Sequence, residues 1–158
     1  MALTREENDL LCRVDNDAPM GRMLRQHHWF PVIPSSALKA GGAPMRVRLT
    51  GKNYVAFRAT DGQVGVLDEQ CVHRKASLAL ARQEPDLHGE GSGLRCIYHG
   101  WKYNTRGEVT DAPNHPGDQA TFCKNLRINR YTAVDKGGIV WAWFGQGDTP
   151  PPFPDLPF

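Results

Sequence analysis

Two short stretches decide how this sequence is interpreted: Cys71-Val72-His73-Arg74 and Cys96-Ile97-Tyr98-His99-Gly100-Trp101. Each stretch brings one cysteine and one histidine close together, so the pair offers two thiolates and two imidazoles. Thiolates and imidazoles are the side chains that many transition metals bind. The sequence therefore contains a candidate metal site with two cysteine and two histidine ligands, built from two loops.

Two kinds of metal centre use this ligand set. Zinc takes four such donors tetrahedrally, but its paired ligands are usually two to four residues apart, and only one residue separates Cys71 from His73. In a Rieske-type [2Fe–2S] cluster, two cysteines bind one iron and two histidines bind the other. Two matching loops can build that cluster, because each gives one ligand to each iron. The spacing favours the cluster and leaves zinc as an alternative.

At these residues the sequence resembles the Rieske domain of ring-hydroxylating, non-haem iron oxygenases of the phthalate-dioxygenase-like branch. The resemblance covers nearly the whole chain and extends to four further stretches: LTREEN at 3–8, PMG at 19–21, WFPV at 29–32 and GIVW at 138–141. It implies that the cofactor is a [2Fe–2S] cluster. The ligands it implies are Cys71, His73, Cys96 and His99.

The resemblance also implies roles beside the ligands. His99 is expected to be the point where the electron leaves toward the catalytic iron of a neighbouring subunit. Arg74 is expected to bond a loop carbonyl or to form a salt bridge with the next domain, and Trp101 to shield the cluster and pack the loop. Residues 84–92 are polar and glycine-rich, and they make the interval between the loops longer than is usual in the family. We expect them to form a surface loop.

The same resemblance predicts a low reduction potential. High-potential Rieske proteins carry an extra cysteine on each loop, which form a disulfide, and a serine hydroxyl directed at a sulfide. The matching positions here hold Ala76, Tyr98 and Trp101. We therefore expect a potential near the low end of the Rieske range, roughly −150 mV or a little above.

Frequent turn residues predict an all-β fold. Sixteen glycines and twelve prolines favour many short elements joined by turns. Apolar and alternating runs predict strands over 29–33, 45–49, 54–58, 64–68, 94–97, 101–104, 108–110, 126–131 and 139–144. We expect a Rieske-type antiparallel sandwich or barrel with two cluster-binding loops, in which the continuously apolar run 139–144 is covered on both faces.

The chain is expected to have three parts. Residues 1–28 form a short helical N-terminal arm, because Thr4 and Glu7 have the spacing of a capping box and Pro19 suits the first turn of a second helix. Residues 29–146 form the Rieske domain. Residues 147–158 are rich in proline and are expected to be an extended linker or tail.

The remaining cysteines, histidines and tryptophans are expected to be structural. We interpret Cys12 and Cys123 as small packed hydrophobic residues, and Trp141 and Trp143 as core residues. Four histidines are expected to be structural or to lie at the surface or in loops: His27, His28, His88 and His115.

Composition limits the class of protein. A length of 158 residues fits one domain, and 40% hydrophobic with 23% charged residues is typical of a globular chain. The net charge of +2 is too small and too scattered to indicate nucleic-acid binding, and the sequence has no run long enough for a membrane span. Because residues 1–7 lack the apolar segment of a signal peptide, we expect a cytoplasmic protein without membrane partners.

The resemblance implies an electron-transfer role within a larger oxidoreductase. The cluster would relay single electrons from a reductase or ferredoxin to a mononuclear iron that hydroxylates an aromatic substrate. That iron needs two histidines and a carboxylate, and the sequence lacks the expected Asp-x₂-His-x₄-His pattern. We therefore expect an N-terminal domain of a longer, trimeric oxygenase, whose catalytic iron lies in a domain of the same or a neighbouring subunit. A stand-alone Rieske ferredoxin and a zinc-bound structural module remain the alternatives.

Overall fold

The computed structural model describes residues 2–87, 89, 91–147 and 149–157. Three α-helices are present in this part of the chain: α1 (Arg5–Cys12), α2 (Pro19–His27) and α3 (Gln119–Cys123). Two short 3₁₀ helices are η1 (Ser35–Ala37) and η2 (Leu78–Leu80). The strands are β1 (Trp29–Pro34), β2 (Met45–Leu49), β3 (Lys52–Arg58), β4 (Val64–Asp68), β5 (Arg82–Glu84), β6 (Gly93–Arg95), β7 (Lys102–Asn104), β8 (Val109–Asp111), β9 (Arg130–Lys136) and β10 (Ile139–Trp143).

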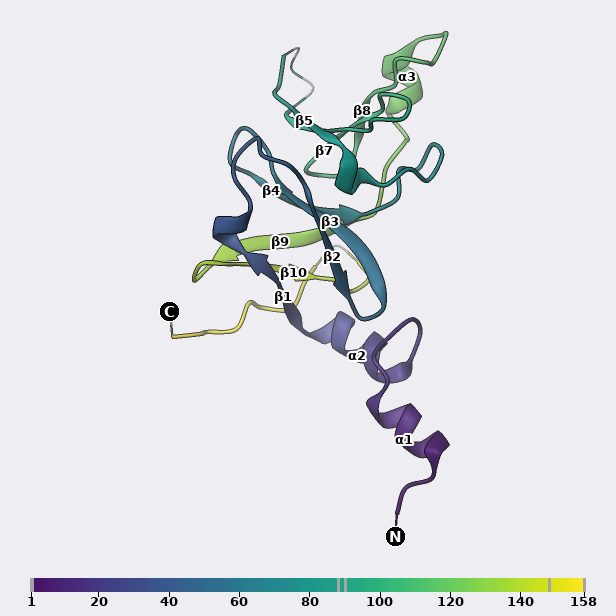
Figure 1. The fold of residues 1–158 in the computed structure, drawn as a ribbon, viewed down its shortest axis with the longest axis vertical. Coiled ribbons are helices and arrows are strands. Elements are labelled where there is room, and N and C mark those ends of the chain that lie inside the picture. Colours follow the sequence, from purple (N-terminus) through teal and green to yellow (C-terminus); the bar gives the residue numbers. More distant parts are fainter. Residues whose placement is uncertain (1, 88, 90, 148, 158) are drawn as a thin grey trace.

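The strands form two antiparallel sheets, as the sequence predicts. The larger sheet has the order β1-β10-β9-β4-β3-β2, and the smaller one has the order β5-β6-β7-β8 (Figure 1). Successive residues of β3 point to opposite faces of the larger sheet. Val55 and Phe57 enter a core shared with the smaller sheet, whereas Tyr54 and Ala56 enter a second core with β10. The predicted all-β antiparallel architecture is confirmed.

The helical arm begins as the sequence predicts. Thr4 and Glu7 form the capping box of α1, and Pro19 is the first residue of α2. Gly21 is required where α2 meets the preceding chain, since a Cβ there would lie 2.1 Å from the carbonyl oxygen of Val14. The two helices extend from one end of the sheets (Figure 1). None of the helices in the described ranges has the length and apolar character needed to cross a bilayer.

Some predicted boundaries are wrong. The strand predicted over 126–131 begins only at Arg130 and continues to Lys136, because Ile128 enters the core from an irregular segment that precedes the strand. The sequence did not indicate β5 or α3. Strand β5 is three polar residues held by pairing with β6, and α3 is a five-residue helix capped by Asp118. Neither element has an apolar period that a sequence pattern could reveal.

The expected surface loop over 84–92 is shorter than predicted. Glu84 pairs with Gly93 across the β5–β6 hairpin, and Ser92 is buried. The exposed part that the structure describes includes Leu87. His88 and Glu90 lie outside the described residues.

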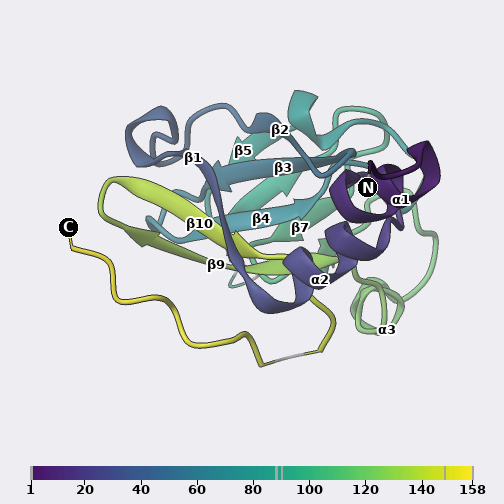
Figure 2. The same cartoon turned by 90° about the horizontal axis from the view of Figure 1, so that it is seen from below.

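The proline-rich tail lies against the outer side of β1 and β10. Trp29 donates a hydrogen bond from Nε1 to the carbonyl oxygen of Pro151 at 3.0 Å, and the Phe153 ring lies 5.4 Å from the Trp29 ring and 5.6 Å from the Trp141 ring. The predicted cover on both faces of residues 139–144 is therefore partial: Val140 and Ala142 are buried in the core, while Trp141 is half-buried. Figure 2 shows the tail running past the sheet edge.

Candidate metal centre

The first loop, residues 71–77, follows β4 and returns the chain to the smaller sheet. Two backbone hydrogen bonds close it. The Cys71 N–H donates to the Ala76 carbonyl at 2.9 Å, and the Lys75 N–H donates to the Cys71 carbonyl at 2.8 Å. These two bonds close the backbone from Cys71 to Ala76 into a tight turn that carries His73.

The second loop, residues 96–101, joins β6 to β7 and closes in the same way. The Cys96 N–H donates to the Trp101 carbonyl at 2.9 Å, and the Gly100 N–H donates to the Cys96 carbonyl at 3.0 Å. In both loops the fourth residue after the cysteine has a positive φ, +60° at Lys75 and +76° at Gly100. The two loops are therefore closed by the same backbone conformation. The sequence indicates the positive φ only in the second loop, where the residue is a glycine.

These equivalent positions give a matched pair of variants. Gly100→Ala is expected to lower the free energy of unfolding by about 1–2 kcal/mol, since a non-glycine residue resists this φ, and its Cβ would lie 2.9 Å from Pro113. Lys75→Gly is expected to change stability little, because relief of the strained φ offsets the added freedom of the unfolded chain. Thermal unfolding and the rate of cluster loss measure both. A Gly100→Ala protein as stable as wild type would contradict this account.

The two cysteine sulfurs lie together in the core. Cys71 is 2% exposed and Cys96 is 3% exposed, and neither forms a disulfide. Burial raises the pKa of the Cys96 thiol, the backbone N–H groups of Tyr98 and His99 lower it, and the neighbouring Cys71 raises it, with a net increase. Two adjacent buried thiolates are costly by themselves. A cationic metal centre between the loops would compensate their charge.

The two imidazoles form a separate pair. The His73 and His99 rings have centroids 4.7 Å apart, and His73 stacks on Trp101 at 4.6 Å with an interplanar angle of 1°. The His73 Nδ1 atom is buried without a hydrogen-bond partner. Burial lowers the pKa of His73, as do His99 and Arg74, which favours the neutral ring that binds metals.

This arrangement fits a [2Fe–2S] cluster. Thiol lies beside thiol and imidazole lies beside imidazole, which is the division expected when one iron takes both cysteines and the other both histidines. A single tetrahedral zinc would instead need all four donors to converge on one point. The orphaned His73 Nδ1 supports a metal ligand at this atom, because a buried polar atom without a partner is otherwise unfavourable.

A comparison with protein families decides what this centre is. The sequence profile of the family described as "Rieske [2Fe-2S] domain" matches residues 28–131, about two-thirds of the chain. The chain belongs to the Rieske [2Fe–2S] domain family. The cofactor of this Rieske domain is accordingly a [2Fe–2S] cluster.

Similar proteins are oxygenase subunits. The Rieske domain is 45% identical over 152 residues to the phthalate 4,5-dioxygenase oxygenase subunit of Pseudomonas putida, an alignment that covers 96% of this chain and 33% of the relative. It is 42% identical over 157 residues to the 3-chlorobenzoate-3,4-dioxygenase oxygenase subunit of Comamonas testosteroni, covering 99% of this chain and 34% of the relative. The chain thus spans about a third of the length of these relatives.

Solved structures share the fold. The oxygenase in the oxygenase–ferredoxin complex of carbazole 1,9a-dioxygenase is 30% identical with a TM-score of 0.64, covering 80% of this chain and 31% of that one. Dicamba monooxygenase gives the same TM-score at 21% identity, covering 77% of this chain and 34% of that one, and so supports the fold alone. The resemblance to oxygenase Rieske domains is confirmed.

One residue beside the cluster was missed by the sequence analysis. The hydroxyl oxygen of Tyr103, on β7, lies 3.0 Å from the Cys71 sulfur and is fully buried. Burial and the neighbouring Cys71 raise the pKa of Tyr103, so this hydroxyl keeps its proton. A protonated hydroxyl donates to a thiolate. The low potential expected from Ala76, Tyr98 and Trp101 therefore has an opposing contribution, since a donor to the sulfur favours the more negative, reduced cluster.

Tyr103→Phe is expected to lower the reduction potential of the cluster by an amount on the order of 50 mV, close to the ~59 mV that corresponds to a tenfold change for one electron. The reason is that the lost hydrogen bond stabilises the reduced state more than the oxidised state. A redox titration followed by visible absorption measures the shift. Tyr98→Phe is the matched control, because Tyr98 is exposed and its hydroxyl has no contact with Cys71 among the described residues. An unchanged potential in Tyr103→Phe would contradict this role.

A second missed residue holds the second loop in place. Arg95, which precedes Cys96, donates to Glu84 at 2.6 Å and to Asp111 at 2.7 Å, and also to the carbonyl of Gly100. It therefore links β5, β6 and β8 to the loop that carries Cys96. The sequence around Arg95 does not indicate these partners, because Glu84 and Asp111 are distant from it along the chain.

The structure also places the other residues that the sequence singled out. Trp101 is buried against His73 and Phe122, whereas Arg74 is exposed and forms no ion pair with a described residue. Cys123 and Trp143 are buried, as expected.

The interpretation of Cys12 as a packed residue is wrong. Its side chain is exposed, because α1 has no buried residue. His27 and His28 are exposed at the end of α2, and His115 stacks on Phe122 in a loop.

Proposed function

We propose that this chain is the electron-transfer domain of an oxygenase component. The observation that carries the proposal is the separation of the two thiols from the two imidazoles in paired loops, within a chain similar to oxygenase subunits. Cys71 and Cys96 hold one iron, and His73 and His99 hold the other. When bound, the cluster takes up and releases one electron at a time.

The residues around the ligands direct the electron. His73 is covered by Trp101, while His99 lies beside the most exposed part of the second loop, where Tyr98 is 62% exposed and Ile97 is 55% exposed. The His99 side is therefore the side on which the electron leaves. Asn114 donates to the His99 carbonyl at 3.1 Å and helps to fix the backbone there. Trp101 covers one face of the His73 ring.

The partners follow from the oxygenase assignment. A reductase or a ferredoxin supplies electrons, and a mononuclear iron in a catalytic domain of the same or a neighbouring subunit receives them to hydroxylate an aromatic substrate. The relatives named for phthalate and 3-chlorobenzoate support an aromatic acid as substrate. A trimeric assembly and a cytoplasmic location belong to this proposal, as does the division into an arm over 1–28, a Rieske domain over 29–146 and a linker over 147–158.

Metal analysis and anaerobic reduction test the proposal. The purified chain is expected to contain about two irons and two sulfides, to take up one electron from dithionite, and to regain its visible spectrum in air. The reduced protein is expected to give the electron paramagnetic resonance signal of a cluster with mixed cysteine and histidine ligands. Zinc in place of iron, or a reduced signal of an all-cysteine cluster, would overturn the proposal.

A further inference from the structure

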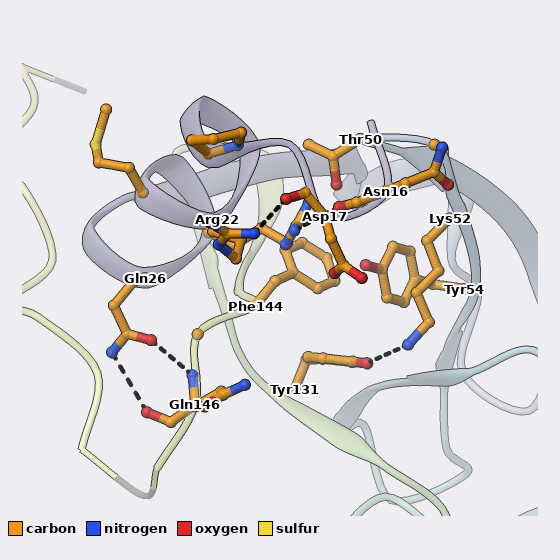
Figure 3. A pocket seen from close by; sticks show the side chains of 15 residues that line it. Asn16, Asp17, Arg22, Gln26, Thr50, Lys52, Tyr54, Tyr131, Phe144 and Gln146 are labelled. Carbon is orange, nitrogen blue, oxygen red and sulfur yellow. Dashed lines mark hydrogen bonds between the residues drawn. The ribbon is translucent and has the colours of Figure 1, made fainter. Parts of the chain in front are cut away.

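A cavity of about 680 Å³ lies between α2, the β2–β3 turn and the end of the larger sheet (Figure 3). It is lined by the arm, by the turn at Thr50 and Gly51, by residues of β3 and β9, and by the segment that follows β10, and it contains none of the proposed cluster ligands. Its volume falls in the range of about 300–1,000 Å³ that is usual for small-molecule sites. The cluster does not account for this cavity.

Two arginines supply positive charge to the cavity. Arg22 and Arg25 stand one helical turn apart on α2, and both line it. Arg25 donates to the carbonyl of Asn16 at 2.7 Å and to that of Val14 at 3.4 Å, and Arg22 donates to the carbonyl of Asp17. Within the described ranges, neither guanidinium forms an ion pair with a carboxylate. Their charge is therefore available to a ligand.

The other charged groups of the lining do not cancel the positive charge of the two arginines. Lys52 lies 2.8 Å from Asp68 and donates to the Tyr131 hydroxyl at 3.1 Å, so its charge is already paired. Asp17 is the one acidic residue of the lining that the structure describes. Two unpaired guanidinium groups thus face a single carboxylate, and the cavity favours an anion.

Aromatic rings form the floor. The rings of Tyr54, Tyr131 and Phe144 lie 4.4–5.0 Å from one another. Burial raises the pKa of Tyr54 while Arg25 lowers it, and the net pKa is raised, so the hydroxyl stays protonated and can donate to an anion. Met23 and Pro19 add apolar surface at the rim. A bare inorganic anion would leave this apolar surface without a partner.

The turn at the cavity rim is strained in a way that suits a binding site. Thr50 has φ +47°, a conformation that β-branched residues rarely adopt, and Asn16, which lies against the same turn, has φ +51°. Glycine or asparagine would fit the Thr50 position better. The side chains of Thr50 and Tyr54 both line the cavity and add hydroxyl groups to its wall. Such outliers cluster at ligand sites.

We propose that this cavity binds a small organic acid, with its carboxylate held between Arg22 and Arg25 and its apolar body against the aromatic floor. The planar guanidinium forks match a carboxylate in geometry and charge. The apolar floor selects an acid with a ring-sized body over a bare anion. The protonated Tyr54 hydroxyl adds a neutral donor.

Calorimetric titration of the cluster-containing chain with benzoate tests the proposal. Benzoate is expected to bind at one site per chain, more tightly than benzyl alcohol or inorganic phosphate. Arg22→Gln and Arg25→Gln are each expected to weaken binding by about tenfold, the loss of one charge-assisted hydrogen bond. Asp17→Asn is expected to strengthen binding about twofold, because it removes the opposing charge. Arg5→Gln is the matched control on α1 and is expected to leave the affinity unchanged.

A second variant separates binding from folding. Thr50→Gly is expected to keep or raise the thermal unfolding temperature, because it relieves the positive φ, and still to weaken benzoate binding severalfold. Equal affinity in wild type and Arg22→Gln, an equal loss in Arg5→Gln, or equal binding of benzyl alcohol or phosphate would overturn the proposal. If the chain forms part of a longer protein, loss of benzoate binding there would also overturn it and indicate that a carboxylate of the protein fills the cavity.

Discussion

Serine in place of Cys71 or Cys96 is expected to abolish the assembled cluster. A serine hydroxyl keeps its proton at neutral pH and is a poor ligand for iron beside sulfide, whereas the thiolate is the ligand that iron–sulfur clusters use. Both cysteine side chains are buried, so solvent has little access to replace a lost thiolate. The visible absorption of the purified variant and its iron content measure the loss, which is expected to be essentially complete. The apoprotein is expected to unfold at lower temperature, because metal binding is coupled to folding.

Cys12 and Cys123 provide the matched controls for this result. Cys12→Ser is expected to leave both the spectrum and the stability unchanged, because the Cys12 side chain is exposed on α1. Cys123→Ser is expected to keep the spectrum and to lose some stability, since the new hydroxyl is buried. A variant of Cys12 or Cys123 that loses the iron would show that the ligands are assigned wrongly.

The proposed ligand set can be derived from the sequence because each loop is local. Cys71 and His73 lie in one turn of chain, and so do Cys96 and His99, so their spacing already restricts the geometry of each half. Only the proximity of the two loops to each other could not be predicted without the fold. The bounds of the strands over 45–49 and 64–68 could also be predicted from the sequence. Turn residues delimit both strands, and alternation of apolar and polar residues marks the first.

The surroundings of the cluster could not be predicted, because they depend on contacts between distant segments. Tyr103 reaches Cys71 only because β7 packs below the first loop, and Arg95 meets Asp111 only across the smaller sheet. The left-handed conformation of Lys75 is invisible in a sequence, since lysine carries no signal for it. The same holds for the cavity beside α2, whose walls come from three separate parts of the chain.

A last expected result concerns what the chain does alone. In oxygenases of this kind, oxygen is activated at a second, mononuclear iron with open coordination positions, held by two histidines and a carboxylate. Outside the two cluster loops, the described residues contain no group of three or more histidine, cysteine or acidic side chains that could hold such an ion. His27 and His28 lie at the end of α2, in the arm, and His115 stacks on Phe122, whose ring contacts Trp101 of the second loop.

The isolated chain is therefore expected to accept an electron and to hydroxylate nothing. The four proposed ligands all come from the two loops, and a [2Fe–2S] cluster held by them would offer no open position to oxygen or substrate. Dithionite is expected to bleach the protein reversibly, whereas added ferrous iron with an aromatic acid and oxygen is expected to yield no product above a control with the Cys71→Ser protein. Chromatography of the reaction measures the product. Hydroxylation that requires the intact cluster would show that residues 1–158 build an oxygen-activating iron site, and the role of this domain would then extend beyond electron transfer.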